Sequence, residues 1–242
     1  MKVLRLAPFA LCATFLAMTA PAQTIQVSKE NRTIAITATD KVIVLADVAT
    51  IHIGFIAYGP DSDSAYAAGS RTSNAIIKAL TSAGVSDDSI ESENQNVSPV
   101  QEYQIDKLTP AEKAQRKFQV TQSWTVRTSA DDAAKVLDVV VKAGANQSGQ
   151  IDWSLKDENT SQSEAASKAL QRARTVATEM AKSLNTNLGA LLYASNETQA
   201  EPPRPLMRAM SAAPMAQKEE PLAINPRRIE KTATVYAVFA IE

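Results

Sequence analysis

Residues 118–128 read FQVTQSWTVRT and show the clearest alternation of apolar and polar side chains in the chain. Phe118, Val120, Trp124 and Val126 fall on one face of an extended segment, and polar residues fall on the other. A period of two with one apolar face is typical of a strand that covers a core on one side only. This stretch therefore predicts a half-buried strand of an antiparallel sheet.

Similar patterns on both sides of this stretch predict further strands. Residues 33–39 (TIAITAT) alternate, and residues 48–57 (VATIHIGFIA) place Ile51, Ile53 and Phe55 on one face. Shorter or weaker strand patterns occupy residues 90–103, 150–156, 188–194 and 229–241. Strands are therefore expected along most of the chain.

Two segments between these strands show the 3.6-residue period of amphipathic helices. Residues 63–82 carry apolar residues at helical spacing, and Gly84 follows where glycine is favoured after a helix C-terminus. Residues 130–143 begin at a capping pattern formed by Ser129 and Asp132. Each of these helices is expected to cover one face of a sheet.

The longest helical pattern covers residues 162–185. Ser161 and Glu164 form its expected capping box. The face opposite the apolar stripe is mostly charged, so one side of this helix is expected to be solvated. The stripe expected to face the core comprises Ala166, Ala169, Leu170, Ala173, Val176, Ala177, Met180, Ala181 and Leu184.

The order of elements favours an α+β fold with mixed or antiparallel sheets packed with three helices. Strand patterns follow one another directly at 33–39 and 48–57, and again at 90–103 and 118–128, which argues against a doubly wound parallel sheet. By length, residues 23–242 form one large domain or two α/β sub-domains. Residues 201–226 hold six of the eleven prolines and are expected to be a flexible loop without regular structure within this domain.

The first 22 residues have the organisation of a secretory signal peptide. Lys2 and Arg5 precede an apolar run at residues 7–18, which is shorter than the roughly 20 residues needed to span a bilayer. Residues 20–22 (Ala-Pro-Ala) match a cleavage site. The mature chain is therefore expected to begin at Gln23 and to work in the periplasm.

Cleavage at this position changes the composition of the mature chain. It removes Cys12, the only cysteine, and with it any disulfide, thiolate nucleophile or thiolate metal site. Of the 25 Lys and Arg residues, Lys2 and Arg5 are lost, which leaves 23 against 26 Asp and Glu. A net charge of −3 argues against electrostatic nucleic-acid binding. No later apolar run reaches membrane length, so no transmembrane span is expected.

The residues offer few groups for catalysis. His52 is the only histidine, and it lies within strand 48–57 on the face opposite Ile51 and Ile53. A lone histidine in a strand is most often structural, so we expect no catalytic role for His52. The acid pairs 87–88 and 131–132 are expected to complement helix dipoles or to solvate turns. No nucleotide-binding glycine motif or nucleophile elbow occurs, and the sequence predicts neither a catalytic site nor a cofactor.

The proline-rich segment also carries three methionines close together, Met207, Met210 and Met215. Thioethers on a flexible loop are potential Cu(I) ligands or oxidisable groups. Their spacing is loose and the surrounding Ala and Pro residues also fit a plain linker. These methionines are therefore only weak candidates for a metal site.

Several short motifs occur in a defined order. Residues 46–51 (ADVATI) open a strand with a D-x-A-x-I pattern. Residues 84–90 (GVSDDSI) are followed by Pro99 and Tyr103. Gly144-Ala145 and Ile151 then precede a helix of the form E-A…A-x-x-x-A-R…A. Its matching residues are Glu164, Ala165, Ala166, Ala169, Ala173, Arg174, Ala177, Ala181 and Leu184.

In this order the motifs resemble those of the SIMPL-domain family of secreted bacterial proteins. This family includes periplasmic immunogenic proteins and oxidative stress defence proteins. The resemblance implies an extracytoplasmic α+β protein linked to envelope stress. It also implies self-assembly, since at least one member forms a large ring-like homo-oligomer. The family has no agreed catalytic residues, so the resemblance assigns none here.

Three functions follow as hypotheses. The leading one is a non-enzymatic periplasmic protein that acts by self-assembly or protein binding, in oxidative or envelope stress defence, with periplasmic or outer-membrane-associated proteins as partners. The alternatives are a carboxylate-based hydrolase, which acids gathered around His52 in a deep pocket would favour, and a methionine-based copper or oxidant buffer. The expected assembly surfaces are sheet edges at 90–103, where Pro99 suggests an edge or bulge, and at 229–241.

Overall fold

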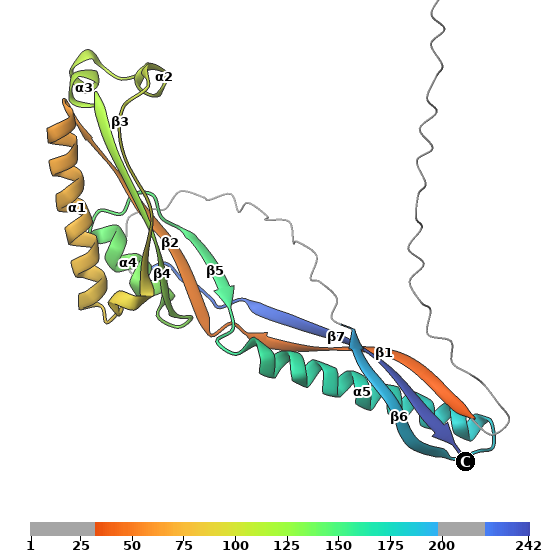
Figure 1. Cartoon of the computed structure of the whole chain (residues 1–242). Coiled ribbons are helices and arrows are strands. Elements are labelled where there is room, and N and C mark those ends of the chain that lie inside the picture. Colours follow the sequence, from red (N-terminus) through yellow and green to blue (C-terminus); the bar gives the residue numbers. More distant parts are fainter. Residues whose placement is uncertain (1–31, 198–220) are drawn as a thin grey trace, which may run out of the picture.

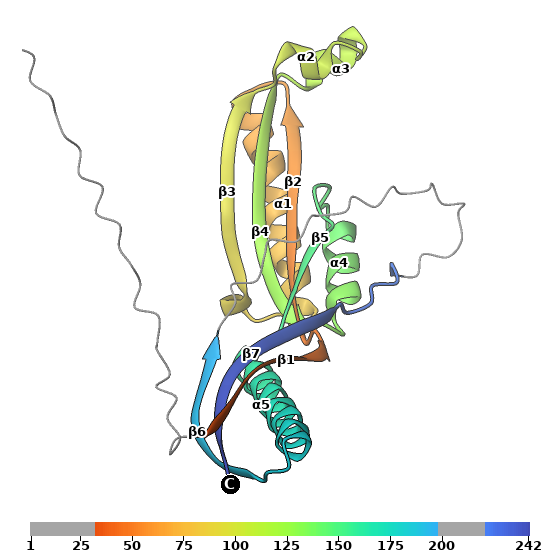
Figure 2. The same cartoon turned by 90° about the vertical axis from the view of Figure 1, so that its right-hand side faces the viewer.

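The computed structural model of the chain describes residues 32–197 and 221–242. These residues form two antiparallel sheets that lie end to end in an elongated, bent molecule, each covered by helix on one face (Figures 1 and 2). The expected α+β class is confirmed, with two separate helix–sheet units.

The larger unit contains a four-stranded sheet in the order β3-β4-β2-β5, with all pairings antiparallel. The predicted strand at 118–128 lies at the interior of this sheet and buries Val120, Trp124 and Val126, as its alternation indicated. Helices α1 and α4 cover the same face (Figure 2). The elements are β2 (Val48–Gly59), α1 (Ser62–Ser82), β3 (Ile90–Pro99), β4 (Phe118–Ser129), α4 (Ala133–Lys142) and β5 (Gln150–Ser154).

The core of this unit is built by large side chains from both layers. The rings of Phe55 and Trp124 pack in a tilted arrangement beneath α1, with their centroids 5.9 Å apart. Gly69 lets α1 approach the sheet closely, because a Cβ at this position would lie 2.8 Å from Val120 Cγ1. Gly84 adopts a φ of 95° after α1, as the sequence predicted for a residue that ends a helix.

The smaller unit contains a three-stranded sheet in the order β1-β7-β6, with α5 on one face. Its elements are β1 (Thr33–Leu45), α5 (Glu158–Ser183), β6 (Leu188–Glu197) and β7 (Arg228–Ile241). Alanines at every fourth position of α5 are fully or almost fully buried against Ile36 and Phe239. Small side chains let the helix lie close to the sheet over its whole length.

Residues around Asp47 connect the two units. The Asp47 carboxylate accepts a hydrogen bond from Lys156 N at 2.7 Å, and its carbonyl accepts one from Ala130 N at 3.0 Å. Ala46 N in turn donates to Arg227 O at 2.8 Å. The D-x-A-x-I motif therefore marks the bend between β1 and β2, where four separate parts of the chain meet.

The pairing of two strands differs from the expectation. Residues 229–241 were expected to be a sheet edge, but β7 is the central strand, with β1 and β6 on its two sides. β1 and β2 follow one another in sequence yet belong to different sheets, because the bend at Asp47 sends them apart. The expected edge at 90–103 is correct, since β3 pairs only with β4. Pro99 is its last residue.

The boundaries of the helices differ in three places. Asp157 caps α5, four residues before the expected Ser161 box, and Ser161 lies buried inside the helix. Ser129 and Asp132 do hydrogen-bond to one another, but in the turn that precedes α4. The connection expected after β3 contains two short helices, α2 (Glu102–Ile105) and α3 (Pro110–Gln115).

The stripe predicted for the long helix is correct for its alanines from Ala169 to Ala181 but wrong for its large side chains. The buried residues form a narrow row, whereas the large side chains Val176, Met180 and Leu184 are 41%, 44% and 60% exposed. The large residues flank the row because the small gap between helix and sheet admits only methyl groups. The buried row comprises Ala165, Ala169, Ala173, Ala177 and Ala181.

Two expectations concern parts of the chain that are described in part or not at all. The signal peptide at 1–22 lies outside the described residues. Of the segment 201–226, residues 221–226 have no regular structure, and Ile224 packs against the core of the larger unit. No helix among the described residues is both long and apolar enough to cross a membrane.

Candidate functional site

His52 lies on the open face of the four-stranded sheet with two carboxylates beside it. Its Nε2 atom lies 2.8 Å from Asp152 Oδ2 on β5, and its Nδ1 atom lies 3.3 Å from Glu93 Oε1 on β3. The His52 side chain is 33% exposed, and both carboxylates are more exposed than it is. This cluster joins the two edge strands of the sheet across its interior strands.

A β-bulge explains how Glu93 reaches His52. The register of β3 against β4 shifts between Ser92 and Asn94, so Glu93 is the extra residue of the bulge. A bulge redirects a side chain out of the regular alternation. Sequence reasoning missed Glu93 for this reason, whereas Asp152 had a detectable signal because it alternates with the inward Ile151 and Trp153.

The geometry around His52 indicates a structural contact between strands, with the imidazole held between one carboxylate from each edge strand. A general base needs a ring nitrogen directed at its substrate, but each nitrogen of His52 faces a carboxylate oxygen. The carboxylates approach opposite nitrogens, and no group of three His, Cys, Asp or Glu residues in the described parts of the chain is arranged to hold a metal ion.

The other acids considered lie at turns and helix ends. Asp87 and Asp88 are exposed in a short 3₁₀ turn, and Asp131 and Asp132 precede α4. The methionine candidates Met207, Met210 and Met215 fall outside the described residues. The described structure therefore brings none of these residues to a common site.

The carboxyls with shifted pKa values are helix caps. The backbone and side-chain hydrogen bonds of Ser64 lower the pKa of Asp61 at the start of α1. Thr160 lowers the pKa of Asp157 in the same way at the start of α5. Because capping accounts for these shifts, they do not indicate an active site.

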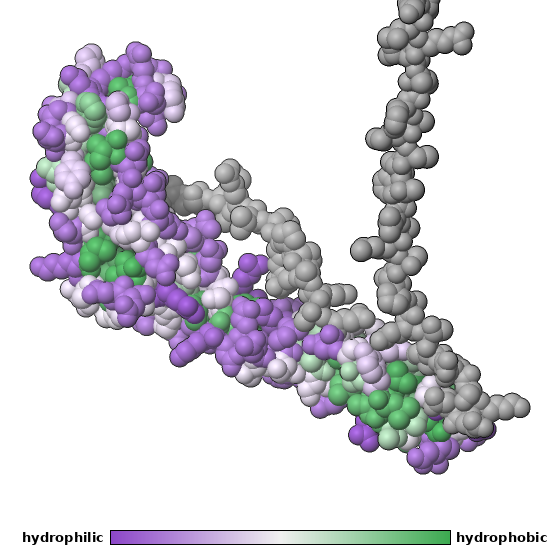
Figure 3. Space-filling model, viewed as in Figure 1, coloured by the Kyte–Doolittle hydropathy of each residue, from purple (hydrophilic) through white to green (hydrophobic). Residues whose placement is uncertain are grey.

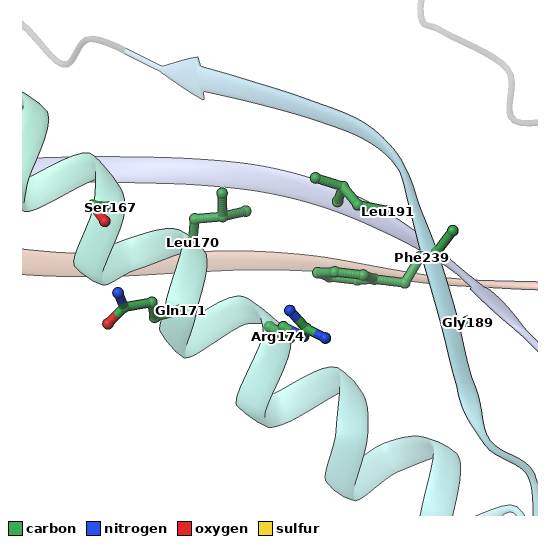
Figure 4. A pocket seen from close by; sticks show the side chains of 8 residues that line it. Ser167, Leu170, Gln171, Arg174, Gly189, Leu191 and Phe239 are labelled. Carbon is green, nitrogen blue, oxygen red and sulfur yellow. The ribbon is translucent and has the colours of Figure 1, made fainter.

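A cavity of about 280 Å³ lies between α5 and strand β6 (Figure 4). The side chains of Leu170, Leu191 and Phe239 point toward one another and form its apolar wall. Arg174 lies one turn along α5 from Leu170 and lines the same space. Ser167, Gln171, Gly189 and Ala190 complete the lining. The chain thus combines an apolar wall and a cation in one cavity.

A second cavity of about 300 Å³ lies between α1 and the β3–β4 pair. It includes Gly69 and Val120 at the close approach of helix and sheet, and Tyr66 at its rim. Amide and hydroxyl side chains make up much of the rest. No charged side chain lines it, so it lacks a group that would select an ionic ligand.

Exposed apolar side chains gather on the smaller unit. Figure 3 shows a hydrophobic region toward the end of this unit that lies away from the larger unit. Leu191, Leu192 and Tyr193 follow one another on the edge strand β6 and are 46%, 55% and 43% exposed. Met180 on α5 and Leu184, which caps the C-terminus of this helix, are also exposed. Three consecutive exposed apolar residues on an edge strand are unusual for a protein that stays monomeric.

Within the described residues, these features define an α+β protein of two helix–sheet units whose prominent surfaces are an apolar edge strand and a cavity beside it. The protein-family model described as "SIMPL: Protein of unknown function (DUF541)" matches residues 34–239. The chain therefore belongs to the SIMPL family, as its motifs indicated.

Two curated relatives carry the name "26 kDa periplasmic immunogenic protein". The protein from Brucella melitensis is 26% identical over 201 residues, and that from Brucella abortus is 25% identical over 201 residues. Each alignment covers 80% of this chain and 80% of the relative. Among solved structures, the regulatory subunit of aspartate kinase from Thermus flavus shares 14% identity over 85% of this chain and 90% of that one. Its TM-score is 0.20, so this likeness carries no conclusion about the fold.

Proposed function

We propose that the chain is exported to the periplasm and acts there without catalysis, through contacts of its surface with further copies of itself or with other envelope proteins. The signal-like start of the chain supports export, as do relatives with periplasmic names at low identity. The link to oxidative or envelope stress defence rests on resemblance to the family.

The observation that carries this proposal is the apolar edge strand β6. β7 hydrogen-bonds to one side of β6, and no described strand pairs with the other side. Natural proteins protect such edges with charged residues, proline or a covering element. β6 instead presents Leu191, Leu192 and Tyr193, which is the composition expected of an edge that another chain covers.

The geometry of the edge favours closed assembly. Two copies that pair through the same strand form a two-fold contact, whereas head-to-tail pairing of different edges forms rings or fibres. The other edge of this sheet, β1, also carries exposed apolar residues, Ile43 and Leu45. A β6-to-β1 contact around a ring would bury both edges.

A charged substitution on the edge tests this proposal. Leu192→Lys places an ammonium group on β6 and should shift the chain toward a smaller species in size-exclusion chromatography. Val141→Lys is the matched control, because Val141 is 51% exposed on α4 of the other unit. An unchanged elution volume for Leu192→Lys, with both variants folded, would remove β6 from the assembly surface.

The stress role is tested separately in cells. A strain that lacks the protein should survive peroxide less well, and the wild-type chain should restore survival. Leu192→Lys should restore it poorly if assembly is part of the function. Full restoration by a variant that no longer assembles would leave a monomeric binding protein as the better account.

A further inference from the structure

The cavity between α5 and β6 arises from an irregularity in the sheet. The register of β6 against β7 shifts between Leu188 and Leu191, where the intervening residues are Gly189 and Ala190. A Cβ on Gly189 would point at Ala240 Cβ, 3.1 Å away, on the sheet face opposite Phe239. Gly189 therefore lines the cavity with backbone alone, and Ala190 beside it carries only a methyl group.

The helix lines the cavity with residues of one face. Ser167, Leu170, Gln171 and Arg174 recur at the i, i+3, i+4, i+7 spacing that places side chains in one row. This row lies beside the buried alanines, so its apolar member meets Phe239 and its polar members reach the rim. The bottom of the cavity is thus apolar, and Arg174 places a positive charge at one end.

No described carboxylate neutralises the charge of Arg174 at the rim of the cavity. No carboxylate among the described residues lies within 4.0 Å of the Arg174 guanidinium, although other acids of α5 are paired. Glu164 pairs with Lys168 at 3.0 Å, and Glu179 pairs with Lys182 at 2.9 Å. Glu242 approaches Gly189, but from the Ala240 side of the sheet, away from the cavity.

We propose that this cavity binds a medium-chain fatty acid, with the acyl chain against Leu170, Leu191 and Phe239 and the carboxylate on Arg174. A guanidinium can hold a carboxylate through two parallel hydrogen bonds. At about 280 Å³ the cavity is near the lower end of small-molecule sites, which begin at about 300 Å³, so it suits one short alkyl chain and not a two-chain lipid. The cavity shares Leu191 with the proposed assembly edge, but it lies within one chain, so octanoate binding does not depend on assembly.

Isothermal titration of octanoate into the purified full chain tests the site. Octanoate should bind saturably at one site per chain. Its affinity should be about fivefold higher than that of hexanoate. Full burial of two more methylenes would raise the affinity by roughly 15-fold, and the smaller factor reflects their partial burial. Octylamine, with the same tail and the opposite charge, should show no saturable binding.

Two neighbouring arginines provide a matched pair of variants. Arg174→Gln should weaken octanoate binding at least about tenfold. Arg172→Gln should leave it unchanged, because Arg172 is exposed on the same helix and does not line the cavity. Leu191→Asn, on an exposed position of β6, should weaken octanoate binding without loss of the fold.

Three results would overturn the proposal. Equal octanoate affinity in Arg174→Gln and Arg172→Gln would show that Arg174 does not hold the carboxylate. Equal binding of octylamine would reduce the interaction to unspecific contact of an alkyl chain with an apolar surface. Tighter binding of an acetylated leucine dipeptide would assign the cavity to a peptide C-terminus. Light scattering on the same samples separates each of these results from a failure of assembly.

Discussion

Substitution of Gly69 by alanine probes the close approach of α1 to its sheet. The added Cβ would lie 2.8 Å from Val120 Cγ1 and 3.0 Å from Val120 Cβ, whereas carbon atoms pack best at about 3.5–4.0 Å. Val120 is buried and branched at Cβ, so its rotamer cannot easily turn away. Either the helix moves outward or the side chain leaves its preferred geometry.

The expected magnitude is the balance of two effects. Overpacking of a filled core costs about 1–3 kcal/mol, and alanine is better than glycine in a helix by about 1 kcal/mol. Gly69→Ala should therefore lower the free energy of unfolding by about 1 kcal/mol. For a chain of this size that corresponds to a fall of about 2–4 °C in melting temperature.

Removal of the branched methyl groups opposite should reduce the cost. In a Val120→Ala background the contact with Cγ1 is gone, but the Cβ of this residue still lies 3.0 Å from the new methyl group. The gain in helix propensity and the remaining overpacking should then roughly cancel. The resulting coupling energy of about 1 kcal/mol is measurable by urea denaturation of the double-mutant cycle. Ser70→Ala, on the exposed neighbour in the same helix, is the control and should change stability by about 0.5 kcal/mol or less. Equal stabilisation by Gly69→Ala in both backgrounds would refute the close packing of α1 on β4.

Three further substitutions test other parts of the account. Asp47→Ala removes the acceptor of Lys156 N at the bend between the two units and should cost about 1–2 kcal/mol in thermal unfolding, with a smaller loss for Asp47→Asn, which keeps an acceptor. His52→Gln removes partly exposed contacts of the imidazole with two carboxylates, so it should change stability by no more than about 1 kcal/mol and leave peroxide survival intact. Loss of survival in a folded, assembled variant would favour an enzyme. Hydrogen bonds from Thr160 hold the pKa of Asp157 below its ordinary value, so the folded chain binds this proton less readily than the unfolded chain does. The stability from this cap is complete above the unfolded pKa and is lost as pH falls through the folded pKa. The melting-temperature difference between wild type and Asp157→Ala should be constant from about pH 7 to pH 5 and should shrink as the pH falls below about 4, the ordinary pKa of an aspartate. A difference that grows on acidification would contradict the capping role.

Local patterns predicted the larger unit well. The alternation at 118–128 is a property of each residue and its near neighbours, and Trp124 and Val126 lie buried where this period places them. The first two helices were found for the same reason, and Gly84 ends α1 with the positive φ that glycine permits.

The pairing of strands that are distant in the sequence could not be predicted from local patterns. β7 is central because β1, from the other end of the chain, pairs with it along its length. No local signal in residues 229–241 distinguishes this position from an edge. The bulge at Glu93 is likewise decided by pairing with β4, so the approach of Glu93 to His52 could not be predicted from strand alternation.

The long helix shows how packing distance overrides residue size. Met180 and Leu184 are more apolar than alanine and were expected inside, but α5 lies so close to β7 that the buried positions admit only Ala173, Ala177 and their equivalents. The displaced large residues remain exposed on the flank of the helix.

Self-assembly is tested most directly by the mass of the unmodified chain in solution. Multi-angle light scattering on the exported protein, across a series of micromolar concentrations, should give a closed species of several chains that dissociates on dilution or in Leu192→Lys. A single species with the mass of one chain at every concentration would contradict assembly through β6.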